Sequence, residues 1–395
     1  MHILILPSWY PAIASDITGV FFRDQALALS KYGHKVGVVS PQLKSLSTIF
    51  KSSDAKEISL FENDGGVLTY RIQKYALLPK IPYGNYYIFK NVAKKLVKQY
   101  ISENGVPDII HAHSAIYGGV VAKEIARKLN IPFVITEHNS GFARKVFANW
   151  QLEIAKNAFD CADSCITVSP NLGSLISKQM PGINIMWQWV PNVVADRFNI
   201  NKNHKQKGAV RFLNLALMTR IKGQSDLLKA FRKVINSGAN AELWFGGNGP
   251  EKAQLEIEVK SLGLEKHVRF LGMIEPNKVP NLLNKIDIMV ISSHYETFGV
   301  VAIEALIAGV PVVATRCGGP ECIVEEGDGE LVSPKNPDSL SRGMLKVMAK
   351  IDQFEPDKIS KKATSRFSGN VIAKQLTDIY ISLVNNKVTS NKLKF

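Results

Sequence analysis

Two glutamates, Glu296 and Glu304, stand eight positions apart at the junction between a strand-like and a helix-like segment. Residues 286–291 form a continuous apolar, β-branched run, which is typical of a strand buried on both faces. Residues 297–299 have turn chemistry, and residues 300–308 can form a helix. We therefore expect Glu296 at the carboxyl end of a strand and Glu304 about two turns into the next helix.

This junction has the chemistry of a phosphate seat. Open α/β sheets bind ligands in the crevice outside the carboxyl ends of their parallel strands. The helix that follows points its free N–H groups and its positive dipole end at that crevice, which favours an anion. Two acids that flank such a seat suggest sugar hydroxyls above and below a pyrophosphate.

A cationic turn lies elsewhere in the same half of the chain. Lys222 and Gly223 follow the first expected strand of that half, where a lysine can meet a diphosphate as a point charge. Arg220 lies two residues earlier and is expected to share the task. An ordinary capping turn with exposed cations is the alternative.

Two glycine-rich loops also follow expected strands. They are residues 246–250 (G-G-N-G-P), which include Gly247 and Gly249, and residues 318–321 (G-G-P-E). Glycine lets a backbone adopt positive φ and approach a ligand closely. A plain tight turn explains either loop alone, but with Lys222 and Gly223 three such loops end three strands, which favours a ligand.

In the first half, His111, His113 and His138 lie at the ends of two expected strands. A lone histidine at a strand end is more often structural, and no carboxylate spacing supports a metal. We prefer His138 as a hydrogen-bond partner for a sugar or a phosphate. Gly19 marks a loop after the first strand, and this loop is expected over the same cleft.

The composition is that of a folded protein of two domains: 395 residues, 46% hydrophobic and 21% charged. The net charge of +15 leans towards the N-terminal half, where residues 74–100 are rich in tyrosine and lysine. This segment favours an anionic membrane surface or a lipid phosphate as a partner. A solvated helix face is the main alternative, and nucleic acid, which we do not expect as a partner, is the least favoured.

Several classes of protein are excluded. No apolar stretch reaches the roughly 18–20 residues of a membrane-spanning helix, and the N-terminal run is broken by Pro7 too early for a signal peptide. No D-x-D pair offers Mg²⁺ ligands, and the cysteines form no zinc pattern, which predicts buried thiols in a reducing compartment. We expect a cytoplasmic protein without a metal or another cofactor.

The chain alternates strands and helices in both halves, which predicts two doubly wound, parallel α/β domains. The expected strands are residues 2–6, 35–40, 108–113, 133–137 and 166–168, then 210–216, 241–246, 268–271, 286–291 and 311–314. A long polar insertion is expected after the second of these strands. The expected parts are domain 1–198, linker 199–208, domain 209–370, and residues 371–395, a helix that packs back on the first domain and a tail.

A set of short motifs covers nearly the whole chain. In chain order they are P-S-W-Y-P with Gly19, Y-G-H-K-V, P-D-I-I-H-A-H, T-E-H, K-G, G-N-G-P, E-x7-E from Glu296 to Glu304, and G-G-P-E. With these motifs the chain resembles the retaining glycosyltransferase family 4, the glycogen-synthase-like branch of the GT-B fold. The resemblance implies two Rossmann-like domains facing a cleft, and transfer of a sugar from a nucleotide sugar with retention at the anomeric carbon.

The resemblance also implies roles for individual residues. Glu296 would contact the donor sugar and Glu304 the ribose, while backbone N–H groups near Phe298 and Gly299 would meet the sugar or the diphosphate. Lys222 would bind phosphate.

His138 would stand at the acceptor-side edge, and Gly19, Gly247, Gly249 and Met273 are further expected donor contacts. One departure concerns the arginine that family members often carry five residues before the lysine, because Leu217 stands there and Arg220 would have to substitute for it.

The sequence thus predicts a metal-independent retaining glycosyltransferase, a hexosyl- or N-acetylhexosaminyl-transferase of surface polysaccharide assembly (capsule, O-antigen or lipopolysaccharide). The expected partners are a nucleotide-diphosphate sugar and a glycan or lipid-diphosphate-linked acceptor at the inner face of the plasma membrane. A nucleotide-sugar 2-epimerase of the same fold and a non-catalytic sugar-nucleotide-binding protein are the alternatives. The residues do not identify the donor base, the sugar or the oligomeric state.

Overall fold

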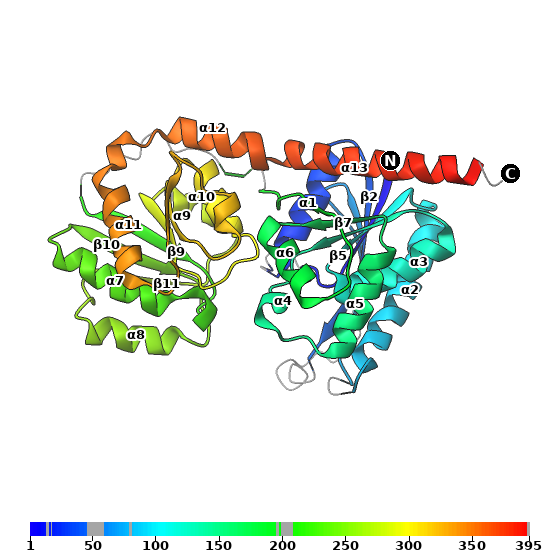
Figure 1. The fold of residues 1–395 in the computed structure, drawn as a ribbon, viewed down its shortest axis with the longest axis horizontal. Coiled ribbons are helices and arrows are strands. Elements are labelled where there is room, and N and C mark those ends of the chain that lie inside the picture. Colours follow the sequence, from blue (N-terminus) through cyan, green and yellow to red (C-terminus); the bar gives the residue numbers. More distant parts are fainter. Residues whose placement is uncertain are drawn as a thin grey trace. The chain divides into compact units, whose positions relative to one another are not determined.

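The computed structural model describes residues 1–12, 16, 18–45, 59–78, 81–194, 197–198 and 208–392. The chain divides into two compact units (Figure 1): unit 1 is Met1–Val193 with Gly369–Phe395, and unit 2 is Val194–Ser368. Most of the linker expected over 199–208 lies outside the described residues. Both units are α/β, as the alternation of elements predicts.

Unit 1 is built on a sheet with the strand order β3-β4-β2-β1-β5-β6-β7-β8. Every pairing is parallel except that of β3 with β4, which is antiparallel. The order reverses between β1 and β5, so the switch point of this sheet lies between these two strands. The strands are β1 (His2–Pro7), β2 (Lys35–Lys44), β3 (Ser59–Asp64), β4 (Val67–Tyr75), β5 (Ile109–His113), β6 (Phe133–Glu137), β7 (Ser164–Thr167) and β8 (Trp187–Trp189).

Helices cover this sheet, and the last helix of the chain returns to it. The helices are α1 (Val20–Lys31), α2 (Gly84–Asn104), α3 (Val120–Leu129), α4 (Gly141–Arg144), α5 (Asn149–Cys161), α6 (Pro170–Gln179) and α13 (Gly369–Lys392). Helix α13 runs beside α1 (Figure 1). Its Tyr380 hydroxyl lies 2.6 Å from His111 Nδ1, and its Thr377 Oγ1 lies 2.7 Å from His34 Nε2.

Unit 2 is built on a parallel sheet with the strand order β11-β10-β9-β12-β13-β14. Its switch point lies between β9 and β12. The strands are β9 (Val210–Leu215), β10 (Ala241–Gly246), β11 (Val268–Gly272), β12 (Ile288–Ile291), β13 (Val312–Thr315) and β14 (Gly329–Val332). The helices are α7 (Gln224–Asn236), α8 (Lys252–Ser261), α9 (Val279–Leu283), α10 (Val300–Ile307), α11 (Pro337–Ala349) and α12 (Pro356–Phe367).

Each unit has its own apolar core. In unit 2 the core includes Phe212 and Phe245 from the sheet and Phe231 from α7, all fully buried. In unit 1 it includes Phe22 from α1 and Tyr380 from α13. Burial of one such side chain contributes about 1.5–3 kcal/mol, so α13 is held on unit 1 by apolar burial as well as by its hydrogen bonds.

The long polar insertion expected after the second strand is described in part. Strand β2 continues to Lys44, residues 46–58 lie outside the described residues, and residues 59–75 form the β3–β4 hairpin, which was not expected. Strand β3 is exposed on both faces along most of its length, so its sequence (S-L-F-E-N-D) lacks the alternation that marks a strand. The short strands β8 and β14 were also missed, and α13 extends beyond the expected helix.

Within the described residues, no helix has both the length and the apolar character needed to cross a membrane.

Candidate functional site

The switch point of unit 2 carries a close pair of opposite charges. Lys222 lies in the turn after β9, and Glu296 lies in the loop after β12. The Lys222 ammonium donates a hydrogen bond to Glu296 Oε1 at 2.6 Å, although the two residues are 74 positions apart in the chain. Their side chains are 25% and 14% exposed, so the pair lies at the surface of the sheet edge and can be reached by solvent.

Glu296 is fixed through both its side chain and its backbone. The hydroxyl of Ser293 donates to the same carboxylate oxygen, Oε1, at 2.7 Å. The backbone N–H of Glu296 donates to the carbonyl of Cys317 at 3.0 Å, which ties this loop to the loop after β13. The Glu296 carboxylate is thus held where three strands of unit 2 end.

The turn that carries Lys222 is packed tightly against the β12 loop. Ser292 Oγ donates to the Lys222 carbonyl at 2.8 Å, and the backbone N–H of His294 donates to the Ile221 carbonyl at 2.7 Å. Gly223 has φ of +63°, and a Cβ there would lie 2.2 Å from the Ser292 carbonyl oxygen. Only glycine fits, because any side chain would push the two loops apart.

Sequence reasoning missed four residues that support this site. Ser292 and Ser293 make the contacts described above, and His294 Nε2 lies 2.8 Å from Asp226 Oδ2 on α7. The available signal was the run of polar residues S-S-H-Y-E directly after an apolar strand. Asp226 had no such signal, since it is one of several polar residues on a helix.

Helix α10 begins at this site. Its N-cap, Gly299, has φ of +104°. A Cβ added at Gly299 would have its nearest neighbour, Pro320 Cγ, at 3.8 Å, so the space beside this residue is open. The Ala302 N–H donates to the Gly299 carbonyl at 2.9 Å. The N–H groups of Val300 and Val301 precede this first bond of the helix and make this end of α10 suitable for an anion. Glu304 is the fifth residue of α10, a little over one turn from its start rather than the expected two turns.

The Phe298 side chain is part of the core. It is 1% exposed and its ring packs 6.2 Å from that of Phe367. The expected donor contact at this position therefore falls to the backbone, which approaches the loop after β13 so closely that a Cβ on Gly319 would lie 2.0 Å from the Phe298 carbonyl oxygen.

The glycines of the β10 loop pack against the β9 loop in the same way. A Cβ on Gly247 would lie 2.0 Å from the Ala216 carbonyl oxygen, and one on Gly249 would lie 2.3 Å from that of Met218. The Met218 N–H also donates to the Asn248 carbonyl at 2.9 Å. These glycines let the loops after β9 and β10 lie together, and their contact with a donor stays a prediction.

Two other expected donor residues of unit 2 are exposed. The Arg220 side chain is 93% exposed, and its nearest carboxylate is Glu251 at 3.9 Å. Met273, just after β11, is 53% exposed. Among the described residues, neither side chain forms a hydrogen bond or an ion pair with Lys222 or Glu296, so the roles of Arg220 and Met273 also stay predictions.

The histidines of unit 1 form a buried cluster. His113 Nδ1 lies 3.0 Å from His138 Nε2, and His111 Nε2 lies 2.7 Å from Thr136 Oγ1. Burial lowers the pKa of His111 and of His138 to about 3, and the pKa of His113 lies well below its usual value for the same reason. The imidazoles are therefore neutral at pH 7.

This burial changes the picture of three imidazoles lining a cleft edge. His111 and His113 are fully buried, and His138 is 6% exposed. His138 Nδ1 has no hydrogen-bond partner of good geometry among the described residues, although the Asn192 side chain lies near enough to the ring to raise its pKa against the effect of burial. A ligand contact by His138 stays a prediction. In the part of the chain that the structure describes, no three or more histidine, cysteine, aspartate or glutamate side chains are placed so that they could hold a metal ion.

Other residues singled out in unit 1 are also placed. Gly19 is the N-cap of α1 with φ of +75°, and a Cβ there would lie 3.0 Å from the Trp9 ring. In the basic segment, Lys90 and Lys94 of α2 pair with Glu124 of α3 at 2.6 and 2.8 Å. This pairing offsets part of the positive charge that the segment presents.

Family models match both units. The model described as Glycosyltransferase Family 4 matches residues 18–186, and the one described as Glycosyl transferases group 1 matches residues 196–366. An uncharacterized glycosyltransferase of Methanocaldococcus jannaschii is 26% identical over 96% of this chain and 98% of its own. A putative teichuronic acid biosynthesis glycosyltransferase of Bacillus subtilis is 25% identical over 88% of this chain and 89% of its own.

The fold is similar to that of the Anabaena protein HepE. Its structure in complex with UDP has a TM-score of 0.74 at 18% identity and covers 97% of this chain and 100% of that one. Its structure in complex with UDP-glucose has a TM-score of 0.72 with the same coverage. The two units are thus the two Rossmann-like domains of the GT-B fold.

Proposed function

Because the chain belongs to the family 4 glycosyltransferases of the GT-B fold, we propose that it transfers a sugar from a nucleotide-diphosphate sugar to a glycan or lipid-linked glycan. We propose further that the anomeric configuration is retained. The observation that carries the proposal is the Lys222–Glu296 pair, which joins the two loops at the switch point of unit 2.

The pair supplies a cation for the diphosphate of a nucleotide-sugar donor and a carboxylate for the hydroxyls of its sugar. A diphosphate gains negative charge as it leaves, and a cation aimed at that charge lowers the barrier. Lys222 provides the cation, and the first-turn N–H groups of α10, which begins at Gly299, provide further donors without a metal ion. Such preorganised donors are worth about 10²–10³-fold in rate each.

Glu296 has a different task in this proposal. Its carboxylate accepts hydrogen bonds from the hydroxyls of the donor sugar, and the hydroxyl of Ser293 holds it in place. Because the Lys222 ammonium touches the same carboxylate, one residue aligns the other, and the sugar is placed beside the phosphate it leaves. Glu304, further along α10, accepts from the ribose hydroxyls.

We propose that unit 1 binds the acceptor and that the reaction belongs to the assembly of a surface polysaccharide. The relative from Bacillus subtilis, a putative teichuronic acid biosynthesis glycosyltransferase, supports this assignment. The basic segment of α2 supports an acceptor at an anionic membrane face, although Glu124 balances part of its charge. Equal flotation of the protein with neutral and with anionic liposomes would count against an anionic membrane surface as a partner.

The test is a donor screen. Thermal shift with a panel of nucleoside diphosphates and nucleotide sugars, UDP and UDP-glucose included, should give one preferred base, followed by transfer or slow hydrolysis of the preferred donor. The matched control is Lys252→Ala, which removes a half-buried cation of α8 paired at 3.7 Å with Glu256. If Lys222→Ala and Lys252→Ala bind the preferred nucleotide alike, the proposal is wrong.

A further inference from the structure

We propose that Arg71 is a positioning residue for sugar transfer, which holds the segment after β1 (residues 8–12) and through it the acceptor-side edge of unit 1. The inference rests on the proposed function, because the acceptor is assigned to unit 1 there. Arg71 belongs to the β3–β4 hairpin, which has no counterpart among the expected elements.

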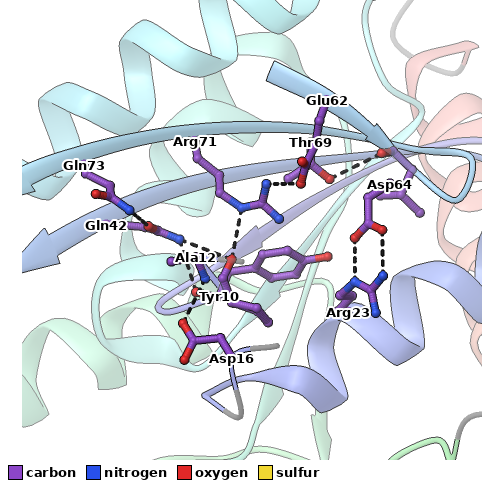
Figure 2. A network of polar contacts seen from close by, with 12 residues as sticks. Tyr10, Ala12, Asp16, Arg23, Gln42, Glu62, Asp64, Thr69, Arg71 and Gln73 are labelled. Carbon is purple, nitrogen blue, oxygen red and sulfur yellow. Dashed lines mark hydrogen bonds and ion pairs between the residues drawn. The ribbon is translucent and has the colours of Figure 1, made fainter. Parts of the chain in front are cut away.

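Arg71 is buried and makes three contacts with different partners. Its side chain is 3% exposed, and its Nε donates to the Pro11 carbonyl at 3.0 Å. Its Nη1 donates to the Glu62 carboxylate on β3, and its guanidinium lies over the Tyr10 ring, 5.4 Å from the centroid. Figure 2 shows the guanidinium between the Tyr10 ring and Glu62.

A second strand contributes to the same segment. Gln42 of β2 donates from Nε2 to the Tyr10 carbonyl at 3.2 Å and to the Pro11 carbonyl at 3.4 Å. Gln42 is held in turn by Gln73 of β4, whose Nε2 donates to Gln42 Oε1 at 3.0 Å (Figure 2). Side chains from two neighbouring strands thus converge on the carbonyls of Tyr10 and Pro11.

The held segment reaches both sides of the unit 1 switch point. Ser8 Oγ lies 2.6 Å from the Ile116 carbonyl oxygen and accepts from the Gly118 N–H at 3.0 Å, in the loop after β5. Trp9 packs on the N-cap of α1, where a Cβ on Gly19 would come within 3.0 Å of its ring. A shift of Tyr10 and Pro11 would therefore move the starts of both loops that open the crevice of this sheet.

The loop after β5 also has an unusual backbone. Ser114 has φ of +65° and Tyr117 has φ of +73°, a region that non-glycine residues seldom adopt. Such conformations persist only where the surroundings determine them, and they cluster at functional sites. Ser8 touches the loop between these two residues, so the segment held by Arg71 is one of the determinants.

Stability alone is a poor explanation for a buried arginine here. Taking a guanidinium out of water is costly, and apolar residues of similar volume often stabilise such a site as well or better. Its carboxylate partner, Glu62, is 39% exposed and therefore partly solvated. What an apolar residue cannot supply is the directed bond to the Pro11 carbonyl.

The experiment compares Arg71→Lys, Arg71→Met and Gln42→Leu with a matched control. Arg71→Lys keeps the charge but cannot contact Glu62 and the Pro11 carbonyl at the same time. Gln42→Leu removes the hydrogen bonds that β2 makes to the Tyr10 and Pro11 carbonyls. The control, Thr377→Val, removes a hydrogen bond of unit 1 near the opposite end of α1, to His34. Hydrogen exchange of residues 8–12 and 115–119 is measured first and needs no activity.

In Arg71→Lys, Arg71→Met and Gln42→Leu we expect faster hydrogen exchange in both segments. The kcat/KM for transfer to the acceptor should fall by about 10²-fold, and the affinity for UDP should not change. The Tm is expected to fall no further than in Thr377→Val. Unchanged exchange in residues 8–12, or a transfer rate equal to that of the control, would overturn the role of Arg71. A wild-type protein without any transfer would refute the proposed function instead, while the exchange result would still decide whether Arg71 holds the segment.

Discussion

The two switch points of this protein carry opposite chemistry. In unit 2 the loops after β9 and β12 bring together an ammonium and a carboxylate, both partly exposed. In unit 1 the strands and loops at the corresponding edge carry buried, neutral imidazoles and a segment held by hydrogen bonds to its carbonyls. The same architecture thus offers solvent-accessible charge for an anionic donor in unit 2 and buried, neutral polar groups in unit 1.

The difference predicts that the two units respond differently to substitution. A site that stabilises charge depends on the presence of its ions, so removal of one charged group should affect the reaction more than the fold. A site made of buried polar groups depends on the hydrogen bonds among these groups. Loss of one such bond should therefore appear first as a lower stability or as faster hydrogen exchange of the segment. The following variants test this contrast.

The largest effect is expected for Glu296→Gln. The amide keeps the shape and the contact with Ser293 but loses the charge that pairs with Lys222 and accepts from sugar hydroxyls. Transfer should fall by about 10³-fold, while the Tm stays close to that of wild type. Steady-state kinetics with the donor from the screen provide the measurement, and a variant that retains a tenth of the wild-type rate would refute the role of Glu296.

Acid should affect unit 1 before unit 2. The pKa of His111 and of His138 is lowered from 6.5 to about 3 by burial, so the unfolded chain binds more protons than the folded one between these values. Stability is therefore present above pH 6.5 and is lost as the pH falls towards 3, by up to about 1.4 kcal/mol per pH unit for each histidine.

This expectation is checked by hydrogen exchange at pH 7 and pH 5. Peptides of β5 and β6 should lose protection at pH 5, and those of β12 (I-M-V-I) and β13 (V-V-A-T), which contain no histidine, should change less. His113→Asn, which replaces one buried imidazole by a neutral amide, should reduce the pH dependence. Equal loss of protection in both units would remove the contrast.

These outcomes depend on contacts that the sequence predicted only in part. The strand before Glu296, the helix that holds Glu304 and the turn at Lys222 were all expected, because each follows from local periodicity and turn chemistry. The contact between Lys222 and Glu296 was not, since it joins residues 74 positions apart. The role of Arg71 was hidden for another reason: its hairpin partner β3 is exposed and has no apolar alternation.

A smaller effect is expected for Gly247→Ala. Its Cβ would lie 2.0 Å from the Ala216 carbonyl oxygen, so the β9 and β10 loops must separate, at a cost of about 2 kcal/mol in the free energy of unfolding. Gly272→Ala is the matched control, because it also has positive φ but meets nothing within 4 Å. Denaturant unfolding of both variants decides whether close approach, rather than φ alone, requires the glycine.

The smallest effect is expected for Arg220→Ala. Its side chain is 93% exposed and lies 3.9 Å from the nearest carboxylate, so water and salt screen its charge. Nucleotide affinity should fall by less than about fivefold, and the difference should vanish at high ionic strength. A loss as large as that of Lys222→Ala would mean that Arg220 replaces the arginine missing at Leu217 as a direct phosphate ligand.

The central claim is that Lys222, paired with Glu296 at the switch point of unit 2, binds the donor diphosphate. Calorimetric titration of wild type, Lys222→Ala and Lys252→Ala with the nucleoside diphosphate selected by the screen tests it most directly. The account predicts that only Lys222→Ala loses affinity, by about tenfold or more, as expected for a hydrogen bond to a charged group. Equal affinity in all three proteins would contradict it.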